Sequence, residues 1–82
     1  MGRKKISMVR ISMEMLGANI RSLREAMGWS VEKLADKVGA TVNYVQKAEA
    51  GKRRITLYAA MAFCDALGVD ANELLNDIVE DE

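Results

Sequence analysis

The chain has 82 residues, half of them hydrophobic, which suits one small domain with a modest core. It contains one cysteine and no histidine, so an intramolecular disulfide is excluded and no metal site is expected. No apolar run approaches the roughly 20 residues that a membrane span needs, and polar residues interrupt any signal-peptide core. Together with the lone cysteine, these features predict a soluble cytoplasmic protein.

The net charge of zero conceals a division of charge along the chain. All twelve Lys and Arg residues lie within residues 1–54, where five acidic residues leave a charge of +7. Residues 55–82 contain seven acidic residues and no basic ones, a charge of −7. A basic surface favours nucleic acid, because phosphate neutralisation supplies most non-specific affinity. The acidic part would face away from DNA or bind a protein partner. Solubility and chance segregation are the alternative interpretation.

We expect residues 1–12 to form a basic N-terminal arm or a short strand, since MGRKK is followed by a β-branched, roughly alternating stretch. A lone strand needs a partner, so this segment is a candidate for pairing with a second copy, and a disordered leader is the alternative. Residues 13–27 then show helical periodicity. Their apolar stripe consists of Leu16, Ile20, Leu23 and Met27.

Four further helices are expected, each with a capping residue before it, and glycines mark the helix ends. Their ranges are 31–38, 42–50, 57–67 and 71–78, with N-caps Ser30, Thr41, Thr56 and Asp70. Gly28 ends the first helix, and Gly39, Gly51 and Gly68 end the next three. The inward positions are Val31, Leu34, Ala35, Val38, Val45, Ala48, Leu57, Ala60, Met61, Phe63, Cys64, Leu67, Leu74, Leu75 and Ile78. We expect an all-α, compact five-helix domain over residues 13–78, followed by an acidic tail at 79–82.

The second and third expected helices meet at a tight turn. Gly39 permits the positive φ that such a turn can demand. Ala35 is small where the next helix must cross closely, and Val45 and Ala48 anchor that helix at a three-residue spacing. Two helices held in this way form a helix-turn-helix. The outward residues of the second helix could then enter a major groove, which is about 12 Å wide.

The motifs in and around this unit resemble the Cro/phage-repressor (XRE) family of helix-turn-helix regulators. The resemblance covers residues 16–75, and its carriers are Leu16-Gly17, Ile20-Arg21-x-Leu23-Arg24, Leu34-Ala35-x-x-Val38-Gly39, Val45, Glu49-x-Gly51-Lys52, Ala66-Leu67-Gly68-Val69 and Glu73-Leu74-Leu75. It implies a lambda-repressor-like fold, in which the helix at residues 42–50 reads double-stranded DNA. It further implies a nucleoid-associated transcriptional repressor that acts as a homodimer and needs no cofactor.

The resemblance assigns roles to individual residues. Arg24 and Glu49 match a pair that forms a partly buried salt bridge between the first and third helices. Base-reading positions fall on Val42, Asn43, Gln46 and Lys47, and phosphate contacts on Thr41, Tyr44, Lys52, Arg53 and Arg54. Amide side chains suit adenine edges and a lysine suits guanine or phosphate. A solvated helix face and a solvated charge run are the alternatives.

The chain departs from the family pattern at three places. Val31 stands where the family commonly has a glutamine that binds phosphate, so that contact is reduced to the backbone amides of the helix N-terminus. Ala48 is smaller than the usual residue, and Arg53-Arg54 replaces a frequent proline. Trp29 is expected to act as a hydrophobic staple rather than as a DNA contact.

Two other functions fit parts of the sequence. The same fold could serve as an antitoxin-like or adaptor module, whose acidic second half binds a basic protein. The chain could also be an enzyme fragment or an accessory domain of a larger protein. The sequence itself provides no support for catalysis, since it has neither a histidine nor a phosphate-binding glycine loop after a strand.

Overall fold

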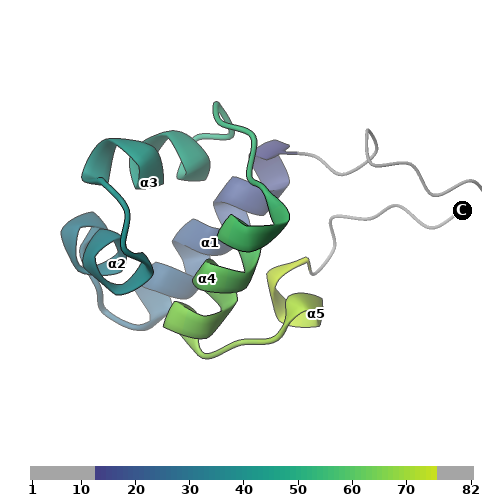
Figure 1. Ribbon diagram of the computed structural model, residues 1–82. Coiled ribbons are helices and arrows are strands. Elements are labelled where there is room, and N and C mark those ends of the chain that lie inside the picture. Colours follow the sequence, from purple (N-terminus) through teal and green to yellow (C-terminus); the bar gives the residue numbers. More distant parts are fainter. Residues whose placement is uncertain (1–12, 76–82) are drawn as a thin grey trace, which may run out of the picture.

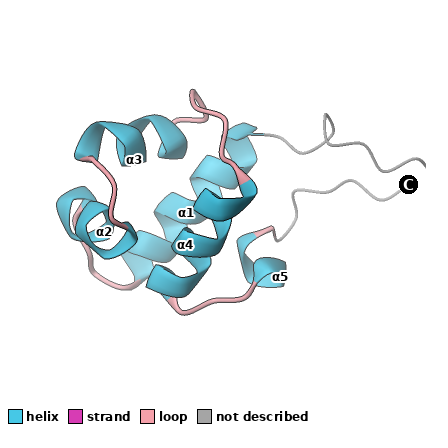
Figure 2. Cartoon of the chain, in the orientation of Figure 1, coloured by secondary structure: helices cyan, strands magenta, loops and turns pink. Residues whose placement is uncertain are grey.

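Residues 13–75, which the computed structural model describes, form five helices joined by short loops, with no strand among them (Figures 1 and 2). The helices are α1 (Met13–Ala26), α2 (Val31–Val38), α3 (Val42–Glu49), α4 (Leu57–Leu67) and α5 (Ala71–Leu74). Helices α1 and α4 run through the middle, with α2 and α3 to one side and α5 to the other (Figure 1). The all-α prediction is confirmed. The expected arm at 1–12 and tail at 79–82 lie outside the described residues.

The helix starts follow from local hydrogen bonds. Ser30, Thr41 and Thr56 accept the backbone N–H three residues ahead, at 3.0, 3.0 and 3.1 Å. At α5, Asp70 accepts the Glu73 N–H while the Glu73 carboxylate accepts the Asp70 N–H, a full capping box. All four predicted N-caps are therefore confirmed, because capping needs only residues adjacent in sequence.

Every helix contributes to one apolar core. Its buried members are Leu16, Ile20, Leu34, Ala35, Val45, Ala48, Phe63, Leu67 and Leu74. Three positions predicted to face inward are instead exposed: Met27, Leu57 and Met61, at 47%, 73% and 58%. Met27 lies in the turn after α1. Helix α4 is apolar almost all round, so its periodicity does not select which face is buried.

The fifth helix is shorter than predicted. It ends at Leu74, and Leu75 is its C-cap with non-helical backbone angles. Ile78, expected on the same face, lies outside the described residues. The side-chain amide of Asn19 in α1 donates to the Leu74 carbonyl at 2.9 Å, which satisfies one of the free carbonyls at this helix end.

Helices α1 and α3 approach each other closely at Gly17. A Cβ atom at this position would collide with the backbone carbonyl oxygens of Ala48 and Glu49. Only glycine therefore allows α1 to lie directly against the end of α3.

Across residues 13–75, no helix is long and apolar enough to cross a bilayer. The same part of the chain contains no group of three or more His, Cys, Asp or Glu side chains that could hold a metal ion.

Candidate nucleic-acid interface

A three-residue turn joins α2 to α3. Gly39 adopts φ 75° and ψ 34°, a left-handed conformation that glycine adopts without steric cost. The Ala40 N–H bonds to the Ala35 carbonyl at 2.9 Å and so closes the end of α2. Thr41 then starts α3 as its N-cap. The turn therefore runs from Gly39 to Thr41, and Gly39 has the positive φ that the tight turn was expected to need.

Helix α3 presents a polar face to solvent because its apolar residues face the core. Val45 and Ala48 are completely buried. Asn43, Gln46 and Lys47 are exposed. These three side chains therefore take no part in the packing, and each carries a group that can donate hydrogen bonds to base edges or phosphates.

Val42 and Tyr44, which the resemblance assigns to a base contact and a phosphate contact, are both half-buried. Each packs against the hydrophobic core. The Tyr44 ring is stacked with Phe63 of α4, with 6.4 Å between ring centroids and 13° between planes. Both side chains thus help to fix α3 on the domain. This packing role was not part of the prediction, which assigned them only to DNA.

The loop after α3 carries the three basic side chains Lys52, Arg53 and Arg54, all exposed. The Lys52 N–H bonds to the Lys47 carbonyl at 2.9 Å, which ties the loop to the end of α3. The Arg53 guanidinium carbon lies 4.9 Å from the centroid of the Tyr44 ring, a cation–π contact. This contact was not predictable from the sequence, since a nine-residue separation across a loop leaves no periodic signal.

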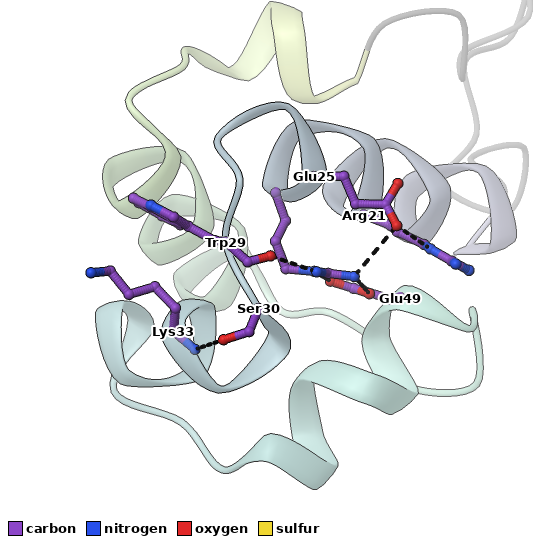
Figure 3. A network of polar contacts seen from close by, with 7 residues as sticks. Arg21, Glu25, Trp29, Ser30, Lys33 and Glu49 are labelled. Carbon is purple, nitrogen blue, oxygen red and sulfur yellow. Dashed lines mark hydrogen bonds and ion pairs between the residues drawn. The ribbon is translucent and has the colours of Figure 1, made fainter.

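A buried ion pair connects α1 to the end of α3. Arg24 Nε donates to Glu49 Oε2 at 2.7 Å and Arg24 Nη2 donates to Glu49 Oε1 at 3.1 Å (Figure 3). The two side chains are only 10% and 8% exposed. The hydrogen bond to Glu49 raises the pKa of Arg24, against the opposing effect of burial. This is the salt bridge that the resemblance implies for these two residues.

The same guanidinium also holds the turn between α1 and α2. Arg24 Nη1 donates to the backbone carbonyl of Trp29 at 2.8 Å (Figure 3). One charged group therefore fixes the end of α3 and the entry to α2 relative to α1. The sequence pattern identified the pair with Glu49 but not this backbone contact, because a carbonyl acceptor has no side-chain signature.

Trp29 is half-buried and packs against the core, beside the N-cap Ser30. The Nζ atoms of Lys33 and Lys37 lie 5.9 and 5.7 Å from its ring centroid. Two cations of α2 thus have an aromatic partner within the protein itself. The four-residue spacing of these lysines places them on one helix face and is the only sequence signal of this arrangement.

Several solved structures are similar to this chain. The restriction-modification controller protein C.AhdI from Aeromonas hydrophila is 34% identical, with a TM-score of 0.73 over 76% of this chain and 94% of its own. The hypothetical transcription factor NHTF from Neisseria is 32% identical, with a TM-score of 0.75 over 89% and 84% of the two chains. The clp gene regulator ClgR from Corynebacterium glutamicum is 28% identical, with a TM-score of 0.74 over 77% and 82%.

Among curated proteins, none matches the chain at a significant level. The model of the HTH_3 helix-turn-helix family, in contrast, matches residues 20–74, which include α2, the turn, α3 and α4 in full. This match covers more than half of the chain, and the protein therefore belongs to the HTH_3 helix-turn-helix family, whose members are DNA-binding regulators.

Proposed function

We propose that this protein is a sequence-specific transcriptional regulator, acting as a repressor, that inserts α3 into the major groove of double-stranded DNA. The observation that carries the proposal is the polar face of α3. Asn43, Gln46 and Lys47 are exposed on a short helix whose opposite face is completely buried. The buried Arg24–Glu49 ion pair holds that helix in one orientation. A rigid, outward-facing set of amide and ammonium groups suits direct readout of base edges.

The proposed phosphate contacts surround this face. Thr41 and Tyr44 lie in the first turn of α3, whose N-terminal end favours anions. Lys52, Arg53 and Arg54 follow its other end. Contacts at both ends of a groove-bound helix would fix its register on the duplex, whereas the central side chains would select the sequence. Val42, being half-buried, would offer only part of its side chain to a thymine methyl group.

Dimerisation is part of the proposal, because one recognition helix covers too few base pairs for useful specificity. The surface offered for a second copy is an apolar groove of about 440 Å³ between α4 and α5. Its walls include Leu57, Met61, Cys64, Leu74 and Leu75, and the first two are 73% and 58% exposed. Large exposed apolar side chains around a hollow are typical of a protein–protein contact. The N-terminal segment, residues 6–12, remains the other proposed pairing element.

Selection of binding sites from a random-sequence duplex library tests this function. We expect enrichment of a two-fold symmetric motif with half-sites about one helical turn apart. Binding of the selected duplex should survive an excess of random competitor DNA. Retention that the competitor abolishes would contradict sequence-specific recognition.

The rival proposal is an adaptor that uses its acidic second half to bind a basic protein. The double substitution of Lys47 and Arg53 by Ala discriminates between the two. The DNA-binding function predicts weaker binding and a shallower salt dependence, since each lost phosphate contact removes about 0.9 from the slope of log K against log salt. An adaptor would keep its partner affinity, because both substitutions lie in the basic half.

A further inference from the structure

The three cations of the loop after α3 differ in how firmly they are held. Arg53 contacts the Tyr44 ring, with 4.9 Å from the guanidinium carbon to the ring centroid. Within residues 13–75, neither Lys52 nor Arg54 takes part in a cation–π contact or a salt bridge. Similar charges at adjacent positions are therefore positioned to different degrees before any ligand binds.

The ring that holds Arg53 is itself anchored in the core. Tyr44 is half-buried and is stacked with Phe63 at 6.4 Å between centroids. Phe63 is only 1% exposed and is among the largest fully buried side chains. The contacts from Arg53 to Tyr44 and from Tyr44 to Phe63 thus join the loop, α3 and α4.

We propose that Tyr44 is a positioning residue, whose ring holds the Arg53 guanidinium ready to bind one DNA phosphate beside the base-reading face of α3. The inference rests on the proposed function and adds a specific role for each of the two residues. A guanidinium that contacts a ring through its face keeps its N–H donors at the edge of its plane. No acidic side chain in the described part of the chain pairs with Arg53, so these donors remain available. Their fork matches two oxygens of one phosphate.

The advantage of the stack is entropic. A long side chain that is free before binding loses rotamer freedom when it contacts a ligand, whereas a side chain already held on a ring loses less. Loss of the ring should therefore weaken DNA binding by about 2- to 10-fold, the range expected for ordering one such side chain. The effect requires Arg53, because Tyr44 acts through it.

A double-mutant cycle on a mixed-sequence duplex tests the inference without knowledge of the operator. Tyr44→Phe is the reference variant, because it removes the hydroxyl proposed as a phosphate contact and keeps the ring. We expect Tyr44→Leu to bind more weakly than Tyr44→Phe in the wild-type background and to bind equally in the Arg53→Ala background, because the ring acts through Arg53. Arg53→Ala should reduce the salt slope by about 0.9, the value for one phosphate contact.

The conservative substitution of the cation gives an independent readout, because Arg53 is exposed and its replacement does not disturb the core. We expect Arg53→Lys to lose part of the affinity while keeping the salt slope, since an ammonium retains the charge but cannot bind two oxygens of one phosphate as a guanidinium does. Arg54→Lys is the matched comparison and should lose less affinity than Arg53→Lys, because no aromatic ring in the described part of the chain holds Arg54. Thermal unfolding of each variant confirms that it is folded at the temperature of measurement.

The outcomes separate this inference from the proposed function. An equal affinity difference between Tyr44→Leu and Tyr44→Phe in both backgrounds, or full affinity of Arg53→Lys, would overturn the positioning role while leaving DNA binding intact. A loss in Tyr44→Phe equal to that in Tyr44→Leu would assign the role to the hydroxyl and also overturn it. A wild-type protein that binds no duplex at low salt would remove the proposed function and the inference together.

Discussion

At the scale of single residues, the Arg24 guanidinium has the most connections of any side chain in the interface. It bonds to both carboxylate oxygens of Glu49 and to the Trp29 carbonyl, at 2.7 to 3.1 Å. Both members of the pair are about nine-tenths buried. A pair in this setting adds little net stability over well-packed apolar residues, but it leaves a stranded charge when one member is removed. Its role is thus to impose one geometry on α1 and α3.

This asymmetry gives the first prediction. Glu49→Ala should lower the free energy of unfolding by about 3–5 kcal/mol, because the Arg24 charge stays buried without its partner. Urea denaturation followed by circular dichroism measures the loss. Arg21→Ala is the matched control. Arg21 lies on α1, as Arg24 does, and pairs with Glu25, but these two side chains are 63% and 54% exposed. Its loss should be below about 1 kcal/mol. Similar losses for both variants would contradict the buried-charge argument.

Gly17 gives the second prediction at this scale. Gly17→Ala should destabilise the protein and also weaken DNA binding, because the added Cβ would force α1 away from the Ala48 and Glu49 carbonyls. Gly28→Ala is the control, since φ is 74° there and the space for a Cβ is open. It should cost about 1–2 kcal/mol through the left-handed backbone alone. Chemical denaturation and duplex titration distinguish the two, and unchanged DNA affinity of Gly17→Ala would show that α3 tolerates the shift.

At the scale of elements, the helix boundaries were predictable wherever a cap or a stop lies next to the helix in sequence. Ser30, Thr41, Thr56 and Asp70 all cap as expected. The exposure of Leu57 and Met61 was not predictable, since an apolar helix has no polar stripe to indicate its outer face. The end of α5 at Leu74 was missed for a related reason, because the apolar pattern continues past the last helical residue.

The candidate site likewise has a part that was predictable from the sequence and a part that was not. The exposure of Asn43, Gln46 and Lys47 follows from their spacing relative to Val45 and Ala48, which face the core. The burial of Tyr44 depends on Phe63, a residue of another helix, and no pattern within α3 contains that information. Apart from the Arg24–Glu49 pair, which the family resemblance implied, contacts between elements were thus the part that the sequence alone could not supply.

Two helix caps allow structure and function to be separated. Thr41→Ala and Thr56→Ala each remove one hydroxyl that accepts a backbone N–H, at 3.0 and 3.1 Å. Each should lower the free energy of unfolding by about 1 kcal/mol, a typical value for an N-cap. Only Thr41→Ala should weaken DNA binding, because Thr41 starts α3, the helix proposed to enter the groove. Thr56 starts α4, which lies behind α3. Denaturation midpoints and duplex titration measure the two effects. Equal affinity losses in both variants would indicate a general effect of stability instead.

At the scale of the whole molecule, the basic and acidic parts of the sequence coincide with the two proposed binding surfaces, one for DNA and one for a second copy. The exposed loop of Lys52, Arg53 and Arg54 follows α3. Around the apolar groove the charged groups are acidic, with Asp65 in its wall and Asp70 and Glu73 near Cys64. A duplex on the basic side would leave the α4–α5 side available for a second copy. The two proposed surfaces therefore do not compete for the same residues.

The groove can be tested with one charged substitution and its neighbour. Leu57→Glu should weaken self-association at least about tenfold, since a fully buried Leu side chain contributes about 1.5–3 kcal/mol relative to exposure. Tyr58→Glu is the control, because Tyr58 is 83% exposed and is not part of the groove wall. Sedimentation velocity over a dilution series measures the dissociation constant of each variant. A dimer that tolerates Leu57→Glu would place the contact elsewhere.

Cys64 supplies an independent readout of the same surface, because its thiol lines the groove. Burial raises the pKa of Cys64 above its ordinary 9.0, with further contributions from Asp70 and Glu73. The reactive thiolate is therefore scarce at neutral pH, and the rate of alkylation should keep rising above the pH at which a free cysteine reaches its plateau. At a given pH, a second copy seated on the groove should slow alkylation as protein concentration increases. We expect this protection in the wild type and in Tyr58→Glu but not in Leu57→Glu. Rates independent of concentration in a protein that sediments as a dimer would exclude the groove as the contact.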